Sequence, residues 1–127
     1  MSYFSINLIN MKITILAFFL FLAFHSYSQD CNSLPTTFTS YKEAMSKIKT
    51  ATFTLIDRVN TSKSSWVRGA SYYSCDKKTG YFIILTDKEE YIHEGVPINI
   101  WRGFKSANSF GTFYNENIRN RFRLIPF

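Results

Sequence analysis

The spacing of apolar residues along the chain is helical at first, then alternating, then helical again. The first helical stripe has the intervals i, i+3, i+4 and i+7 and consists of Tyr41, Ala44, Met45 and Ile48. This spacing predicts a helix over residues 40–48, whose first amides Thr39 or Ser40 can cap. Residues 51–59 are dense in β-branched side chains, which indicates a strand directly after the helix.

Three further strands are predicted over residues 65–75, 81–85 and 90–94. Connections of four or five residues join them, and a parallel crossover needs a longer one. The strands are therefore expected to pair as antiparallel hairpins. Residues 81–85 are apolar on both faces, so this strand is expected at the centre of the sheet.

Two helical stripes complete the pattern. Pro97 stands where a helix can begin, because the first turn has no use for its missing amide. The first stripe consists of Ile100, Trp101, Phe104 and Ala107, and the second of Phe110, Tyr114, Ile118 and Phe122. The whole pattern predicts an α+β fold: an antiparallel sheet of about four strands with an N-terminal helix and two C-terminal helices packed on one face.

The N-terminal segment has the pattern of a signal peptide. Residues 13–24 follow Lys12 without a charge, a run too short to span a bilayer. The small residues at positions 26–28 suit cleavage near Ser28, so residues 1–28 are predicted to be a cleaved leader and the product periplasmic or secreted. The basic region begins only at Met11-Lys12, so Met11 competes with Met1 as the start. Gln29-Asp30 before Cys31 argues against a lipid anchor, and no stable membrane span is expected after cleavage.

Two cysteines, Cys31 and Cys75, follow the predicted leader. In an oxidising compartment an even count in a small domain favours a disulfide. Closing such a loop contributes roughly 4 kcal/mol on the chain-entropy model. The alternatives are free buried thiols, or a Cys75 that acts as a nucleophile or metal ligand.

The stretch Tyr91-Ile92-His93 places a phenol and an imidazole on the same face of a strand. We expect this pair to pack under the C-terminal helices against Trp101, Phe104 and Phe113, with Ser64, Ser65 or Asn115 as polar partners and with no reactive pocket. The catalytic alternative makes His93 a base for Ser65, Tyr72 or Cys75. The spacing supplies no orienting acid or oxyanion hole, and too few histidines and cysteines remain for a usual zinc site. No catalytic residue, metal or cofactor is therefore expected.

The second half of the chain resembles the KTSC domain, a module named for the C-terminus of some lysyl-tRNA synthetases. The resemblance is carried by Ser64-Ser65, Tyr91, Val96-Pro97, Trp101 and the run from Ala107 to Asn115 that leads to Ile118-Arg119. Two positions depart from the family pattern: the central Tyr-x-Tyr appears as Tyr91-Ile92-His93, and Phe122 replaces a usual tyrosine. The resemblance implies a KTSC-like domain over residues 63–127, with residues 29–62 as an added helix and strand. It implies no established activity, and RNA binding is the function suggested for the family.

The formal charge of +6, or +5 without the leader, suits an anionic partner and also suits a soluble surface. The chain is therefore predicted to be a small exported, non-catalytic binding module for an unknown protein, glycan or other anionic ligand. Candidate contact residues are Ser65, Tyr72, Tyr91, His93, Asn115, Arg119 and Arg123.

The alternative is a single-stranded nucleic acid or RNA ligand. In that case Arg119 and Arg123, one helical turn apart, form a cationic ridge, supported by Arg102 and Lys105. Exposed aromatics of the sheet, Tyr72, Tyr73 and Tyr81, would stack the bases. Export weakens this alternative, because little RNA is available in the periplasm.

Overall fold

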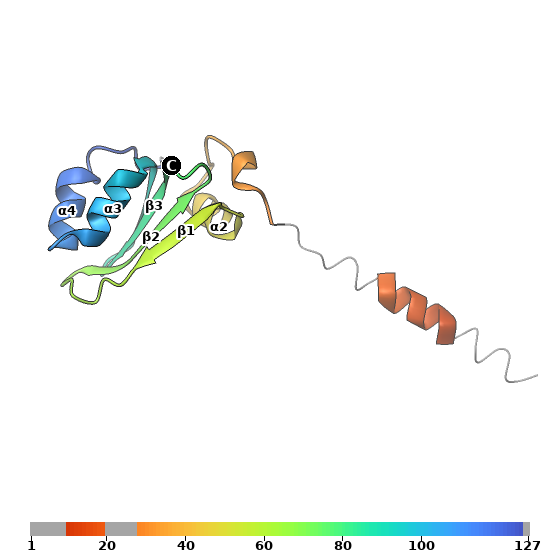
Figure 1. The fold of residues 1–127 in the computed structure, drawn as a ribbon. Helices are drawn as coiled ribbons and strands as arrows, with labels where there is room; N and C mark the ends of the chain where they lie inside the picture. The colour runs from red at the N-terminus through yellow and green to blue at the C-terminus, as the bar shows by residue number, and fades with distance from the viewer. Residues whose placement is uncertain (1–9, 20–27, 126–127) are drawn as a thin grey trace, which may run out of the picture.

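The computed structural model describes residues 10–19 and 28–125 (Figure 1). Its elements are, in chain order, η1 (Cys31–Ser33), α2 (Tyr41–Thr50), β1 (Leu55–Val59), β2 (Val67–Ser74), β3 (Thr79–Thr86), β4 (Glu90–Pro97), α3 (Ile98–Ser106) and α4 (Phe110–Asn117). Residues 10–19, within the predicted leader, form a helix with exposed apolar side chains. Most of the predicted cleavage region lies outside the described residues. Within the two described ranges, no helix is long and apolar enough to cross a membrane.

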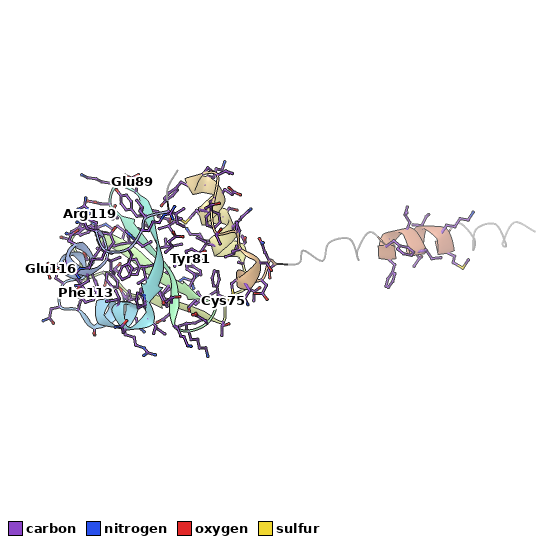
Figure 2. All side chains as sticks on the ribbon, turned by 90° about the horizontal axis from the view of Figure 1, so that it is seen from above. Cys75, Tyr81, Glu89, Phe113, Glu116 and Arg119 are labelled. Carbon is purple, nitrogen blue, oxygen red and sulfur yellow. A yellow bond between two sulfur atoms is a disulfide. The ribbon has the colours of Figure 1, made fainter. Side chains whose placement is uncertain are left out.

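The four strands form one antiparallel sheet in the order β1-β2-β3-β4. Helices α3 and α4 cover one face of this sheet and α2 covers the other (Figures 1 and 2). The predicted α+β fold is thus confirmed, and β3 lies inside the sheet as its two apolar faces indicated. Since β1 pairs with β2 along its whole length, the added helix and strand are part of the same folded unit as the rest.

The helix starts follow the capping residues of the sequence. Ser40 precedes α2 and its hydroxyl accepts from the amide of Glu43 at 3.1 Å. Ser109 does the same for α4, accepting from the amide of Thr112 at 3.2 Å. Pro97 is the residue that precedes the first turn of α3, where a free amide is not needed.

Two predicted bounds differ most from the structure. The strand predicted from residue 51 begins only at Leu55, because α2 continues to Thr50 and Thr52 instead makes an isolated bridge with Asp30. The last helix ends at Asn117, so Ile118 and Phe122 follow it in turns and do not extend its apolar stripe as helix.

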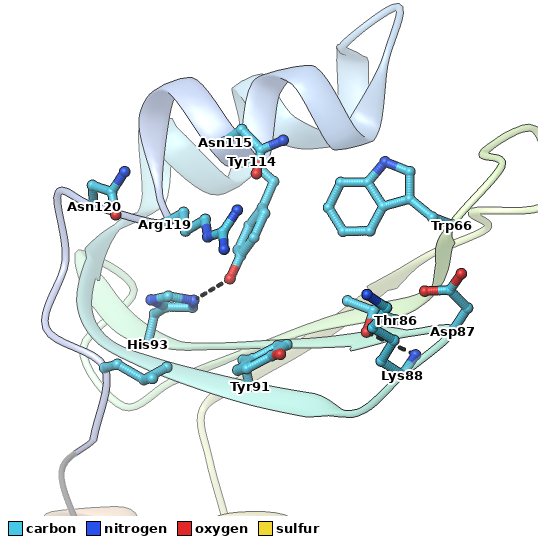
Figure 3. A pocket seen from close by; sticks show the side chains of 11 residues that line it. Trp66, Thr86, Asp87, Lys88, Tyr91, His93, Tyr114, Asn115, Arg119 and Asn120 are labelled. Carbon is cyan, nitrogen blue, oxygen red and sulfur yellow. Dashed lines mark hydrogen bonds between the residues drawn. The ribbon is translucent and has the colours of Figure 1, made fainter.

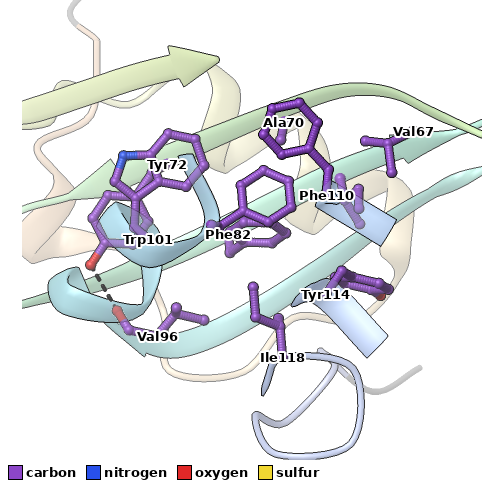
Figure 4. Close-up of a cluster of buried hydrophobic side chains, with 11 residues drawn as sticks. Val67, Ala70, Tyr72, Phe82, Val96, Trp101, Phe110, Tyr114 and Ile118 are labelled. Atoms are coloured by element: carbon purple, nitrogen blue, oxygen red, sulfur yellow. Dashed lines mark hydrogen bonds between the residues drawn. The ribbon is translucent and has the colours of Figure 1, made fainter. Parts of the chain in front are cut away.

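The face under α3 and α4 is an aromatic core (Figure 4). The Tyr72 and Trp101 rings stack, with centroids 5.4 Å apart and planes 9° from parallel. Phe82 from β3 meets Phe104 edge-on, with centroids 5.0 Å apart. The three rings of Tyr72, Phe82 and Phe104 are fully buried, so this core anchors both C-terminal helices to the sheet.

The opposite face has a second core, in which aliphatic side chains pack with Tyr73. Its buried members are Ala44 and Ile48 from α2, Tyr73, Ile83 and Ile92 from the sheet, and Ile125 from the C-terminal tail. The tail lies along the outer edge of β4, where the amide of Ile125 donates to the carbonyl of Ile92 at 3.2 Å. The amide of Glu94 donates to the carbonyl of Arg123 at 3.1 Å, so the tail partly covers a strand edge that would otherwise be open.

Cys31 and Cys75 lie at disulfide distance, with Cα atoms 5.9 Å apart. The pair joins η1 to the chain just after β2, on the α2 side of the sheet (Figure 2). No cysteine of the described residues is free, so the alternatives of free thiols and of a reactive or metal-binding Cys75 do not match this structure.

Candidate functional site

A cleft of about 710 Å³ opens between α4 and the β3–β4 hairpin (Figure 3). Its walls come from four places: the approach to β2, the turn after β3, strand β4, and α4 with the chain that follows it. The lining residues are Trp66, Thr86, Asp87, Lys88, Tyr91, His93, Tyr114, Asn115, Arg119, Asn120 and Leu124. Four of the seven candidate contact residues meet here: Tyr91, His93, Asn115 and Arg119.

His93 forms the inner end of the cleft and is 1 % exposed. Its Nε2 lies 2.7 Å from the hydroxyl of Tyr114, and its Nδ1 lies 3.5 Å from the carbonyl oxygen of Phe122. A carbonyl can only accept, so Nδ1 carries the proton and Nε2 accepts from Tyr114. Both ring nitrogens are therefore occupied by fixed partners within the protein.

Burial sets the protonation of this pair. It lowers the pKa of His93, which keeps the imidazole neutral at pH 7. It raises the pKa of Tyr114 to about 12, which keeps the phenol protonated. A neutral imidazole that accepts from a protonated phenol stabilises the junction of β4 and α4 and has no nitrogen left to activate a nucleophile.

The three nucleophiles of the catalytic alternative lie elsewhere. Ser65 is exposed outside the cleft, and its carbonyl accepts from Arg68 Nη2 at 2.9 Å. Tyr72 is buried, and its hydroxyl donates to the carbonyl of Val96 at 2.7 Å. Cys75 is joined to Cys31. The structure therefore brings none of them to His93, and neither Ser65 nor Tyr72 lines the cleft.

Tyr91 lies half-buried on the floor of the cleft (Figure 3). Its hydroxyl donates to Glu89 Oε1 at 2.8 Å, and this bond raises the pKa of Tyr91. The partners expected for the Tyr91 and His93 pair were thus wrong. Ser64 instead accepts from the amide of Val67 at 3.0 Å, and the pair is held by Glu89, Tyr114 and Phe122.

The expected burial holds for His93 but not for Tyr91, and both residues line the cleft. The Phe82 ring packs against His93, with centroids 6.2 Å apart. Tyr91, by contrast, is half-buried and meets a ligand-sized space between α4 and the β3–β4 hairpin.

Arg119 is the exposed cation on the wall of the cleft beside Tyr114 (Figure 3). Its charge opposes the rise in pKa of both Tyr91 and Tyr114, which places the guanidinium near the two phenols. Among the ion pairs of the described residues, none includes Arg119.

Arg123 lies elsewhere. Its Nε is 3.5 Å from Glu94, and it lines a second hollow of about 610 Å³ on the disulfide side. Since the helix has ended before either arginine, the predicted helical ridge of Arg119 and Arg123 is wrong.

The prediction that the sheet exposes an aromatic face for nucleic-acid stacking is also wrong. Tyr72 is 0 % and Tyr73 4 % exposed, because helices cover both faces of the sheet. Tyr81 packs edge-on against Phe53, with centroids 6.2 Å apart. Tyr72 and Tyr73 therefore belong to the two cores, and the half-buried Tyr81 lines the second hollow.

Sequence reasoning missed two aromatic walls of the cleft, Trp66 and Tyr114. Trp66 lies directly on Gly111 of α4: a Cβ added at Gly111 would come within 2.4 Å of the indole Nε1. A glycine inside a helical stripe is a signal of such close approach. The sequence shows this glycine but not which ring, about 45 positions earlier, packs against it.

The geometry defines a small α+β domain with a cleft between α4 and the β3–β4 hairpin. Residues 70–122 match the KTSC domain, as the resemblance indicated. The crystal structure of a KTSC domain protein from Yersinia pestis is also similar, at 26 % identity and a TM-score of 0.48, over 57 % of this chain and 99 % of that one. No curated protein matches the chain.

Proposed function

We propose that this chain is an exported, non-catalytic binding module whose cleft takes a small anionic ligand. The observation that carries this proposal is Arg119, an exposed guanidinium on the cleft wall that joins none of the ion pairs of the described residues. Arginine presents a planar fork of donors that matches carboxylate and phosphate groups. The amides of Asn115 and Asn120, both exposed on the cleft wall, add further neutral donors.

The shape of the site supports binding. Ligand sites commonly enclose roughly 300–1,000 Å³, and they combine apolar walls with a few polar groups. The cleft has about 710 Å³ and aromatic walls from Trp66, Tyr91 and Tyr114. Its one histidine is neutral and has both nitrogens occupied, which favours recognition over acid–base chemistry.

Export is supported by the cysteine pair and by the leader pattern. A disulfide in a domain of this size is typical of proteins that fold in an oxidising compartment. The predicted partner is then a soluble extracytoplasmic molecule or the acidic group of a glycan or protein.

The test is a titration of the full chain with inorganic phosphate and with citrate at low salt. The side-chain Nε–H of Arg119 and the backbone amides of the residues that line the cleft are followed by NMR. We expect saturable shifts that Arg119→Gln abolishes, since the variant removes the cation and leaves the wall. Arg121→Gln is the matched control, because Arg121 lies outside the cleft with its Nε bonded to the carbonyl of Glu116 at 2.9 Å. Absence of any saturable shift, or equal losses in both variants, contradicts the proposal.

Single-stranded nucleic acid is the second candidate, because Arg119 shares the cleft with the rings of Trp66 and Tyr91. A short oligothymidylate is expected to bind with an affinity that falls steeply as salt is added, and to lose that affinity in Arg119→Gln. If such oligomers show no salt-dependent retention by the wild-type chain, this candidate is removed and the small anion remains.

A further inference from the structure

We infer that the cleft recognises its ligand in two parts and that the ligand is a small acid carrying a ring: the ring lies against Trp66 and the acid group against Arg119. This inference rests on the proposed anion-binding function and adds the chemical class of the ligand. Figure 3 shows Trp66 and Arg119 on opposite sides of Tyr114 in the same cleft. An inorganic anion would engage only the Arg119 end.

The Trp66 wall is held rigidly. The indole ring rests on Gly111, where an added Cβ would come within 2.4–2.7 Å of three of its atoms. It also meets Tyr114 edge-on, with centroids 6.1 Å apart. Aromatic walls that are fixed before binding cost little entropy when a ring packs against them.

The other two aromatic side chains of the cleft are fixed by hydrogen bonds. The hydroxyl of Tyr114 donates to His93 Nε2 at 2.7 Å, and the hydroxyl of Tyr91 donates to Glu89 Oε1 at 2.8 Å. Both O–H groups already donate to acceptors within the protein. A ligand in the cleft therefore meets the faces and edges of these two rings and not a free O–H donor. The cleft therefore offers apolar ring surface between its two ends.

The charges of the cleft differ between its ends. Asp87 and Lys88 lie together at the Trp66 end, where the amide of Asp87 donates to the carbonyl of Trp66 at 3.0 Å. Their formal charges cancel there. Arg119 lies with the neutral amides of Asn115 and Asn120, so the excess positive charge is at the opposite end. This arrangement directs the acid group of a ligand toward Arg119 and its uncharged ring toward Trp66.

A matched set of probes tests the two parts separately. Inorganic phosphate supplies the acid alone, phenol and glucose supply rings alone, and phenyl phosphate and glucose 1-phosphate supply a ring and an acid together. We expect at least one ring phosphate to bind about tenfold more tightly than inorganic phosphate, because ring packing adds to the anion contact. If phenyl phosphate binds more tightly than glucose 1-phosphate, the cleft prefers an aromatic ring; the reverse order indicates a sugar ring.

The chain has two tryptophans, which provide an internal reference for the same titration. The indole N–H of Trp66 is expected to shift with the ring phosphates. That of Trp101 should stay in place, because it is buried and donates to Asp57 Oδ2 at 2.8 Å.

Two variants separate the ring contact from the acid contact. Trp66→Leu should reduce the affinity for the ring phosphate to that for inorganic phosphate and leave the latter unchanged. Gly111→Ala should act in the same direction, because the new methyl group displaces Trp66. Gly103→Ala is its control: a Cβ there would meet Phe113 at 2.8 Å, outside the residues that line the cleft, so the preference for ring phosphates should survive.

Failure of this inference differs from failure of the proposed function. If inorganic phosphate binds through Arg119 but ring phosphates bind no more tightly, the two-part inference is wrong and the anion site stands. The inference is also wrong if Trp66→Leu retains the full preference for ring phosphates. If no anion binds in an Arg119-dependent way, both are wrong.

Discussion

The two faces of the sheet are stabilised in different ways. The α3–α4 face is a continuous aromatic core, and most of its residues come from the 53 positions between 70 and 122 that match the KTSC domain. The α2 face is assembled from separate pieces: a ten-residue helix, the C-terminal Ile125 and a segment joined through Cys31–Cys75. The comparison indicates that ring packing dominates the first face, whereas the second face combines a smaller ring cluster around Phe53 with a covalent link.

The cleft belongs to the first face. Its walls include Tyr114 of the aromatic core and Trp66 and Tyr91, which pack against that core, so the walls continue the core packing. The second hollow lies on the other face, beside the disulfide. Changes to the α2 face are therefore expected to alter stability without altering the cleft.

The largest effect is expected from Phe82→Ala. Phe82 is fully buried and touches His93, Trp101, Phe104 and Tyr114, so its removal leaves a cavity at the centre of the aromatic core. The free energy of unfolding should fall by about 4 kcal/mol. Urea denaturation measures it, with Leu85→Ala as the control on the same strand, since Leu85 is 39 % exposed. Equal costs for the two variants would contradict the importance of the aromatic core.

Removing the disulfide is expected to have the next largest effect. A Cys31→Ser, Cys75→Ser double variant should lose about 3 kcal/mol, because the unfolded chain regains the freedom of a loop with a separation of 44 residues. Hydrogen exchange should increase in α2, while the amides of α3 and α4 keep their protection relative to global unfolding. Equal loss of that relative protection in all three helices would show that the two faces are not independent.

Much of the fold was predictable because its signals are local. The alternating stretches and short turns between residues 65 and 94 indicated the antiparallel hairpins, and the paired cysteines indicated the disulfide. The end of α4 was not predictable from its stripe. Ile118 continues the spacing of four and is fully buried, but the chain reaches that position as a turn and not as helix.

The cleft was predicted only in part, for a physical reason. Tyr91 and His93 share a face by strand periodicity, but their bonding partners depend on how distant segments pack. The hydroxyl that reaches His93 comes from Tyr114, 21 positions away, and Trp66 reaches Gly111 from the other end of the domain. Contacts of this kind leave no spacing signal in a single sequence, so the wrong serines were chosen as partners.

A smaller effect is expected from the protonation of His93. Burial lowers the pKa of His93 in the folded state below its ordinary value of about 6.5, so the unfolded state binds the proton first as the pH falls. Stability from the neutral imidazole is therefore complete above about pH 6.5 and declines below it. Between pH 7.5 and 5.5 the wild-type chain should lose about 1 kcal/mol more than His93→Gln, measured by urea denaturation at each pH. Parallel pH profiles would show that the imidazole is not held neutral. His93→Ala should also lower stability at pH 7.5 through lost packing.

The smallest effects are expected from the ion pair that each face forms between a helix and the sheet. Lys49 Nζ lies 3.0 Å from Glu90 on the α2 face, and Lys105 Nζ lies 2.6 Å from Asp57 on the other. Both pairs are partly exposed, so Glu90→Gln should cost about 0.5 kcal/mol or less, and 1 M salt should remove that cost.

Asp57→Ala should cost about 1 kcal/mol and keep most of that cost in salt, because Asp57 also accepts from the indole N–H of Trp101. Asp57→Asn separates the two contributions, since its amide oxygen still accepts from Trp101 but no longer attracts Lys105. If Asp57→Asn is as costly as Asp57→Ala at high salt, the bond to Trp101 does not help to hold α3, and the aromatic face depends on ring packing alone.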